Sequence, residues 1–210
     1  MAKARHRNKS SSSMYAVSHL SQCELQLTLI QIDNCLYSRS YKIADLMGQL
    51  IDEYFISHLS LTQAESEELH QRYYKDYGLA IEGLVRHHKI DPLEYNSQVD
   101  DALPLDDIIK PNPQLRKLLQ DLDREKVKLW LFTNAYWRHG RRVVKLLGVE
   151  DCFDGITYCD YGAEKLLCKP AEAMYEKAMR EAGVAVSENC YFVGAFSFWR
   201  DDCSWLLTLW

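Results

Sequence analysis

The sequence lacks the features that mark membrane-spanning, secreted or zinc-cluster proteins. It contains no run of about 18 apolar residues, which a transmembrane helix would need. Its first residues are basic and serine-rich, without the apolar segment of a secretory signal peptide. Its 7 cysteines form no Cys-x-x-Cys pair, so neither a zinc cluster nor a disulfide framework is indicated. We therefore expect a protein of a reducing compartment, the cytoplasm, that does not contact membranes.

Basic residues are scarce for a protein that binds nucleic acid polymers. The chain of 210 residues has a formal net charge of −5, whereas such proteins usually present a basic face. We expect no nucleic acid polymer as partner, although a local cationic pocket for a phosphate is compatible with this balance. The composition, 47% hydrophobic and 26% charged, is that of a globular protein whose length allows one sizeable core and a small insertion.

Residues 1–24 are expected to form a disordered tail. They are basic, include four consecutive serines, and contain no acidic residue before Glu24. A mitochondrial transit segment is the alternative, because such segments are also arginine- and serine-rich and poor in acids.

The first strand is expected within residues 25–30, an apolar run that breaks into a polar turn carrying one acidic residue, Asp33. Such a run suits a buried strand of a parallel sheet. The turn then lies at the carboxyl edge of the sheet, where ligands bind in open α/β folds. The sequence therefore predicts a ligand site around Asp33.

Helical patterns dominate the next part of the chain. Thr62-Gln-Ala-Glu65 is a capping box that begins one helix, and Gly78 is suited to end it. Residues 39–105 are far longer than the dozen or so residues that a simple crossover needs, so a separate helical lobe is predicted after the first strand. The expected helices span residues 43–55, 62–77 and 80–88 and a segment that begins at Pro92.

Strands and helices alternate in the rest of the chain, which predicts an α/β fold with a Rossmann-like, doubly wound parallel sheet. The acidic pair Asp106-Asp107 falls in a linker before this part. The expected elements are a helix from Asn112-Pro113, a strand at 128–134, a helix at 136–147, a short strand at 156–160, a helix at 170–182 and a strand at 189–193.

Short polar motifs follow three of these strands: Asp33-Asn-Cys-Leu-Tyr37, Thr133-Asn134 and Lys169-Pro170. In these motifs the chain resembles the haloacid dehalogenase superfamily, and in particular its pyrimidine 5'-nucleotidase branch. The resemblance covers residues 29–193 or so. It implies a haloacid dehalogenase-like core at 25–38 and 106–193, a helical cap at 39–105 and a divergent aromatic tail at 194–210.

The resemblance also implies roles for single residues. Asp33 matches the general acid and base, and its backbone carbonyl matches one contact to Mg²⁺, the expected cofactor. Thr133 and Asn134 match the residues whose hydroxyl and backbone amide bind phosphoryl oxygens, and Lys169 matches the ammonium that offsets the charge of the phosphate. The implied reaction is Mg²⁺-dependent dephosphorylation of a nucleoside monophosphate such as UMP or CMP.

Two positions depart from the family pattern. Gln31 stands where the family has its aspartate nucleophile, and Gly194-Ala195 stand where it has two acidic metal ligands. Asp201-Asp202 lie seven residues further along the chain. The pattern therefore predicts a hydrolase fold with impaired chemistry.

Three hypotheses follow from these departures. The chain is a phosphatase rebuilt around Asp33, or a catalytically silent relative that still binds a phosphate ester through Thr133, Asn134 and Lys169. The third hypothesis is a mis-joined or truncated product of an active gene.

Overall fold

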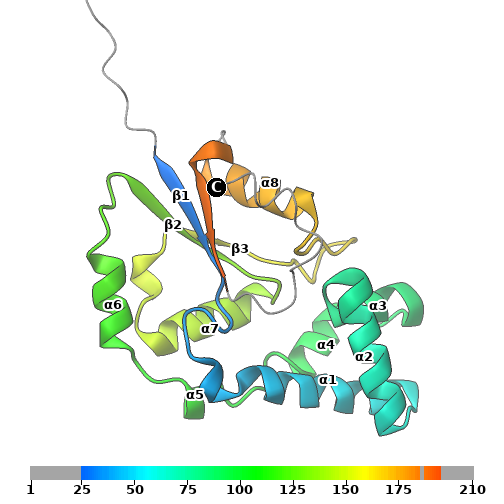
Figure 1. The fold of residues 1–210 in the computed structure, drawn as a ribbon. Helices are drawn as coiled ribbons and strands as arrows, with labels where there is room; N and C mark the ends of the chain where they lie inside the picture. Colours follow the sequence, from blue (N-terminus) through cyan, green and yellow to red (C-terminus); the bar gives the residue numbers. More distant parts are fainter. Residues whose placement is uncertain (1–24, 185–186, 195–210) are drawn as a thin grey trace, which may run out of the picture.

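The computed structural model describes residues 25–184 and 187–194 (Figure 1). Its centre is a parallel four-stranded sheet in the order β3-β2-β1-β4. The strands are β1 (Gln26–Ile30), β2 (Val127–Phe132), β3 (Gly155–Thr157) and β4 (Cys190–Val193). β1 pairs in parallel with β2 and with β4. The predicted parallel α/β sheet is therefore confirmed, with the first two strands side by side.

Helices cover both faces of the sheet (Figure 1). Leu27 and Leu29 of β1 pack against α8 (Glu172–Ala182), whereas Ile30 packs in the opposite core with α7 (Trp137–Leu147). This alternation follows from the pleat of a strand, which sends successive side chains to opposite faces. Leu119 of α6 (Pro113–Gln120) joins the core of α7. The sheet is thus buried on both sides, as its continuous apolar runs require.

Four further helices form a separate layer beside the carboxyl edge of the sheet (Figure 1). Their core contains Phe55, Ile81 and Leu84, all fully buried. The Thr62 capping box is present, since Thr62 N–H donates to Glu65 Oε2 at 2.8 Å and Glu65 N–H donates to Thr62 Oγ1 at 3.4 Å. The helices are α1 (Ile43–Leu59), α2 (Gln63–Tyr77), α3 (Ala80–His88) and α4 (Pro92–Gln98).

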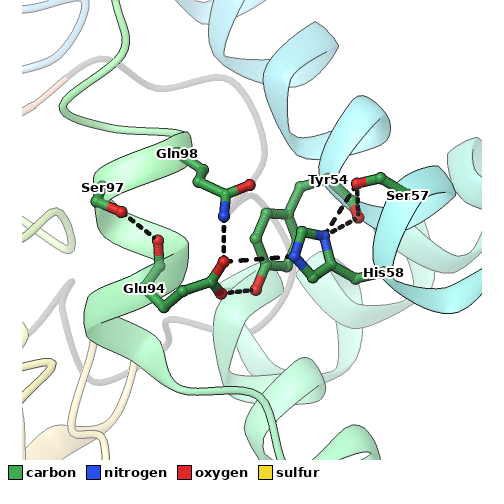
Figure 2. Close-up of polar contacts among 6 residues, drawn as sticks. All are labelled: Tyr54, Ser57, His58, Glu94, Ser97 and Gln98. Carbon is green, nitrogen blue, oxygen red and sulfur yellow. Dashed lines mark hydrogen bonds and ion pairs between the residues drawn. The ribbon is translucent and has the colours of Figure 1, made fainter.

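A polar cluster joins α1 to α4 inside this layer. Figure 2 shows Tyr54 and His58 of α1 converging on the carboxylate of Glu94 on α4. The Tyr54 hydroxyl donates to Glu94, and His58 Nε2 lies 3.3 Å from Glu94 Oε1. The Tyr54 and His58 rings also stack, with centroids 3.8 Å apart. Because Glu94 is anchored by several donors, this cluster fixes how α4 packs on α1.

Three local predictions were wrong. β3 ends at Thr157 rather than near 160, because Cys159 and Tyr161 turn away from the sheet and are buried against the α1–α4 layer. α8 begins at Glu172 rather than Pro170, after a turn closed by Ala171 N–H to Cys168 O at 3.1 Å. The expected linker contains the short helix α5 (Leu105–Ile108), which Leu105 anchors in the core.

No helix in the described part of the chain is both long enough and apolar enough to cross a membrane. The predictions for residues 1–24 and for the tail beyond Gly194 lie outside the described residues.

Two glycines provide a test of how closely the helical layer approaches the core. Gly78 and Gly183 both have positive φ, at +76° and +72°, but only Gly78 lies against another segment. A Cβ on Gly78 would lie 2.6 Å from the carbonyl oxygen of Lys169, whereas one on Gly183 would meet nothing within 4 Å.

We expect Gly183→Ala to lower the free energy of unfolding by about 1–2 kcal/mol from backbone strain. Gly78→Ala is expected to cost about 1–3 kcal/mol more from overlap. Urea denaturation measures both, and equal losses would contradict the close approach.

Candidate functional site

Asp33 lies just beyond β1, at the carboxyl edge of the sheet, and its carboxylate is held from two sides. Its Oδ1 accepts the Tyr37 hydroxyl at 2.7 Å and His139 Nε2 at 2.8 Å. The His139 side chain is fully buried in the first turn of α7, whereas 34% of the Asp33 side chain is exposed. Asp33 is therefore partly exposed to solvent, while its Oδ1 is held in place by two hydrogen bonds.

His139 was not predicted as a site residue. The position of His139 in the sequence could have indicated this contact. The helix that follows the second strand begins at the same sheet edge as Asp33, so a histidine in its first turn can reach that carboxylate.

Asp33 and His139 each shift the pKa of the other toward its charged form. Burial acts to raise the pKa of Asp33, but the charge of His139 and the two hydrogen bonds hold that pKa below its usual range. Burial acts to lower the pKa of His139, but Asp33 and then Asp100 hold it above its usual range. Burial raises the pKa of Asp100 itself to about 6. The pairing therefore favours the ionised form of Asp33 and makes His139 easier to protonate than a free imidazole.

Lys169 brings a buried ammonium to the same edge. Its Nζ donates to the carbonyl oxygen of Phe132 at 3.1 Å and lies 4.9 Å from the centre of the Phe132 ring. Burial lowers the pKa of Lys169 to about 8, and the carboxylate of Asp33 opposes that shift. The structure thus brings Lys169 and Asp33 together, as the sequence motifs predict.

Thr133 and Asn134 directly follow β2, at the same edge of the sheet. The Asn134 side chain clamps the backbone of Lys169: Oδ1 accepts its N–H at 2.7 Å, and Nδ2 donates to its carbonyl oxygen at 3.0 Å. Thr133 Oγ1 accepts the Ala135 N–H at 3.0 Å. The Asn134 side chain therefore positions Lys169, which leaves the Thr133 hydroxyl and the Asn134 backbone amide as the groups predicted to bind phosphoryl oxygens.

The two departures from the family pattern lie next to each other. Gln31 Nε2 donates to the carbonyl oxygen of Asp33 at 3.3 Å, and the Gln31 backbone N–H donates to Val193 O at 2.8 Å. A Cβ on Gly194 would lie 2.9 Å from Gln31 Oε1 and 2.7 Å from the Phe192 ring. A side chain at position 194 would therefore meet two neighbours, the Phe192 ring and the end of the flexible Gln31 side chain.

The described part of the chain does not provide a magnesium site. Mg²⁺ prefers octahedral oxygen ligands, and the Gln31 amide engages one of the two lone pairs of the Asp33 carbonyl expected to contact it. Within residues 25–184 and 187–194 no group of three His, Cys, Asp or Glu side chains could hold a metal ion. Asp201 and Asp202 lie outside the described residues.

The parallel sheet and its polar carboxyl edge define an α/β protein of Rossmann-like architecture. The family described as haloacid dehalogenase-like hydrolase matches residues 32–195, and the chain belongs to that family. Phosphate metabolism protein 8 of Saccharomyces cerevisiae is 43% identical over 170 residues, which are 77% of this chain and 53% of the yeast protein. The chain therefore spans about half the length of this relative.

A solved structure gives the same fold. The haloacid dehalogenase-like hydrolase family protein SP0104 from Streptococcus pneumoniae superposes with a TM-score of 0.50 at 16% identity. The match covers 83% of this chain and 77% of that one.

The buried ammonium of Lys169 is expected to lower the free energy of unfolding at neutral pH. Because the pKa of Lys169 falls from 10.5 to about 8 on folding, the unfolded chain binds more protons between these values. Below pH 8 the buried charge therefore costs stability, and the cost disappears as pH rises toward 10.5. We expect Lys169→Met to raise the free energy of unfolding by about 2 kcal/mol at pH 7, after the lost hydrogen bond is subtracted.

Urea denaturation at pH 7 and pH 10 measures this difference. The gain should shrink at the higher pH, and the exposed control Lys145→Met should change little at either. A destabilised Lys169→Met at pH 7 would show that the ammonium is fully compensated in the folded protein.

Proposed function

We propose that the chain binds a pyrimidine nucleoside monophosphate through its phosphate group and hydrolyses it very slowly or not at all. The observation that carries this proposal is the Gln31 carboxamide, which stands at the nucleophile position and donates to the Asp33 carbonyl beside the buried Lys169. The nucleotide class rests on the resemblance to pyrimidine 5'-nucleotidases. The name of the yeast relative, a phosphate metabolism protein, agrees with phosphate chemistry.

Lys169 supplies the attraction for the phosphate. Lys169 is 8% exposed, and its Nζ donates a hydrogen bond to a neutral carbonyl oxygen, Phe132 O. A phosphate beside it would restore the charge pairing that burial removes, because charge-assisted hydrogen bonds to phosphate are among the strongest in proteins. Asp33 offsets this less than a carboxylate without partners would, since its Oδ1 already accepts hydrogen bonds from Tyr37 and His139.

Gln31 changes the chemistry more than the binding. A carboxylate can attack phosphorus and form an acyl phosphate, whereas a carboxamide is too weak a nucleophile for that step. Removing a nucleophile from a cooperating site can cost on the order of 10⁶-fold in turnover. The neutral amide also removes a negative charge from beside the bound phosphate, which favours the ground-state complex.

One observation favours hydrolysis as a second candidate. The Asp33–His139 pair retains a fixed carboxylate with one oxygen open, the arrangement that a general acid and base requires. The two candidates differ in turnover, so they are separable by experiment.

Binding is tested by calorimetric titration of UMP into the full chain, with chelator present. We expect binding that Lys169→Met weakens at least tenfold, because it removes a charge-assisted contact of about 1.5–3 kcal/mol. Lys145→Met, which changes an exposed lysine, should bind as the unaltered chain does. Absence of heat with UMP and CMP, or equal affinity in the Lys169→Met variant, would refute the proposal.

Turnover is tested by restoring the family pattern. We expect phosphate release from UMP to be negligible in the unaltered chain and in Gln31→Asp alone. The combined Gln31→Asp, Gly194→Asp, Ala195→Asp variant should gain chelator-sensitive release, because it restores the nucleophile and the acidic residues of the family pattern. Shortening Gln31 also removes one of the two contacts that a side chain at 194 would meet. Chelator-sensitive release by the unaltered chain would favour the rebuilt-phosphatase hypothesis instead.

A further inference from the structure

A groove of about 700 Å³ lies between α7 and the segment that follows α5, residues 109–111. Figure 1 shows α5 next to α7, and an ion pair between Arg142 of α7 and Asp106 of α5 joins them. A cleft of this size is in the range that proteins use to bind ligands. The groove shares no lining residue with the site of Asp33 and Lys169, so the proposed function leaves it unexplained.

Positive charge predominates in this groove. α7 contributes Arg141, Arg142 and Lys145 to its lining, and Lys110 lies on the other wall. Against these four basic residues the lining has two carboxylates, whereas the chain as a whole has a formal net charge of −5. A groove with excess positive charge on an acidic protein favours an anionic partner, because complementary charge speeds the encounter and selects the partner.

Part of this charge is already compensated inside the groove. Arg142 Nε donates to Asp106 Oδ2 at 2.9 Å, and Lys110 Nζ donates to the backbone carbonyl oxygen of Asp106 at 2.9 Å. Arg141 and Lys145 are exposed, and neither forms an ion pair within the described part of the chain. They are four residues apart on α7 and are therefore neighbours on its surface. These two cations are available to the acidic groups of a ligand.

An apolar wall accompanies the cations. Ile109, Pro111 and Leu146 line the same groove, and Ile109 and Leu146 pack in the core with α7. Inorganic phosphate would leave this wall uncovered, and the carboxylate of Glu150 would repel the continuous charge of a nucleic acid backbone. A peptide that has both acidic and apolar side chains matches the cations and the wall together, as protein interfaces combine an apolar centre with a polar rim.

We propose that the groove between α7 and residues 109–111 is a docking site for an acidic segment of a partner protein. Carboxylates of the segment pair with Arg141 and Lys145, and an apolar side chain of the segment packs against Leu146 and Pro111. The inference does not depend on the proposed function, because the Lys169 site is built from other residues.

Three synthetic peptides test the chemistry of the partner on the unaltered chain. The first is Glu-Asp-Leu-Glu-Asp-Leu with blocked ends, the second has serine for leucine, and the third has lysine for the acidic residues. Each is titrated into the isotope-labelled full chain and followed by amide NMR shifts. We expect the first peptide to shift the amides of Ile109, Lys110 and Leu146, and the other two to bind about tenfold or more weakly.

Each comparison can overturn the proposal. Equal binding of the serine peptide would reduce the contact to unspecific attraction of charge, and equal binding of the lysine peptide would remove the charge complementarity. No shift with any peptide, or shifts confined to Asn134 and Lys169, would likewise contradict docking in the groove. The last result would assign the peptide to the phosphate site instead.

A pair of matched variants tests the two cations. We expect Arg141→Gln combined with Lys145→Gln to weaken the first peptide about threefold or more, because two ion pairs at an exposed rim are lost. Lys75→Gln combined with Lys165→Gln removes the same charge from exposed lysines outside the groove and should bind as the unaltered chain does. Equal weakening in both double variants would show that only net charge matters, and would refute the docking site.

Discussion

The burial of the Lys169 ammonium is the constraint on which the rest of the site depends. A cation removed from water costs free energy unless partners replace its hydration. Here the Phe132 carbonyl accepts from Nζ, the Asn134 side chain holds the backbone of the residue, and the last turn of α2 packs against the same peptide. Structure from β2, from the α1–α4 layer and from the loop before α8 thus converges on one charge. A buried charge of this kind, at the ligand edge of a parallel sheet, is typical of a functional site, and an anion there is what we propose.

Gln31 and Gly194 are best understood as one change. The carboxamide of Gln31 donates to the carbonyl of Asp33 and lies where a side chain at 194 would have to pass. A side chain added at position 194 alone would meet both the Gln31 carboxamide and the Phe192 ring. In the proposed account, Gln31 replaces the nucleophile and engages a carbonyl expected to contact the metal, while Lys169, Thr133 and Asp33 keep their places. A site altered in this way loses chemistry before it loses affinity.

Local chemistry made much of the fold predictable. The Thr62 capping box, the Gly78 stop and the Asn112-Pro113 start each act within a few residues, and the structure has all three. The β3 end and α5 were missed because burial of Cys159 and Leu105 against distant residues decides them. The site divides in the same way. Asp33 and Lys169 could be placed at one edge because parallel strands end together, whereas the His139 contact and the Asn134 clamp depend on side-chain directions that spacing does not encode.

The central claim is that the chain holds a phosphate ester that it does not cleave. A ³¹P NMR spectrum of UMP mixed with an equal amount of the full chain, followed over days with Mg²⁺ present, observes both halves of that claim. The account predicts an ester resonance that is shifted by binding and persists without growth of an inorganic phosphate signal. An unshifted ester resonance would contradict the binding, and a steadily growing inorganic phosphate signal would contradict the claim that the site does not hydrolyse the ester.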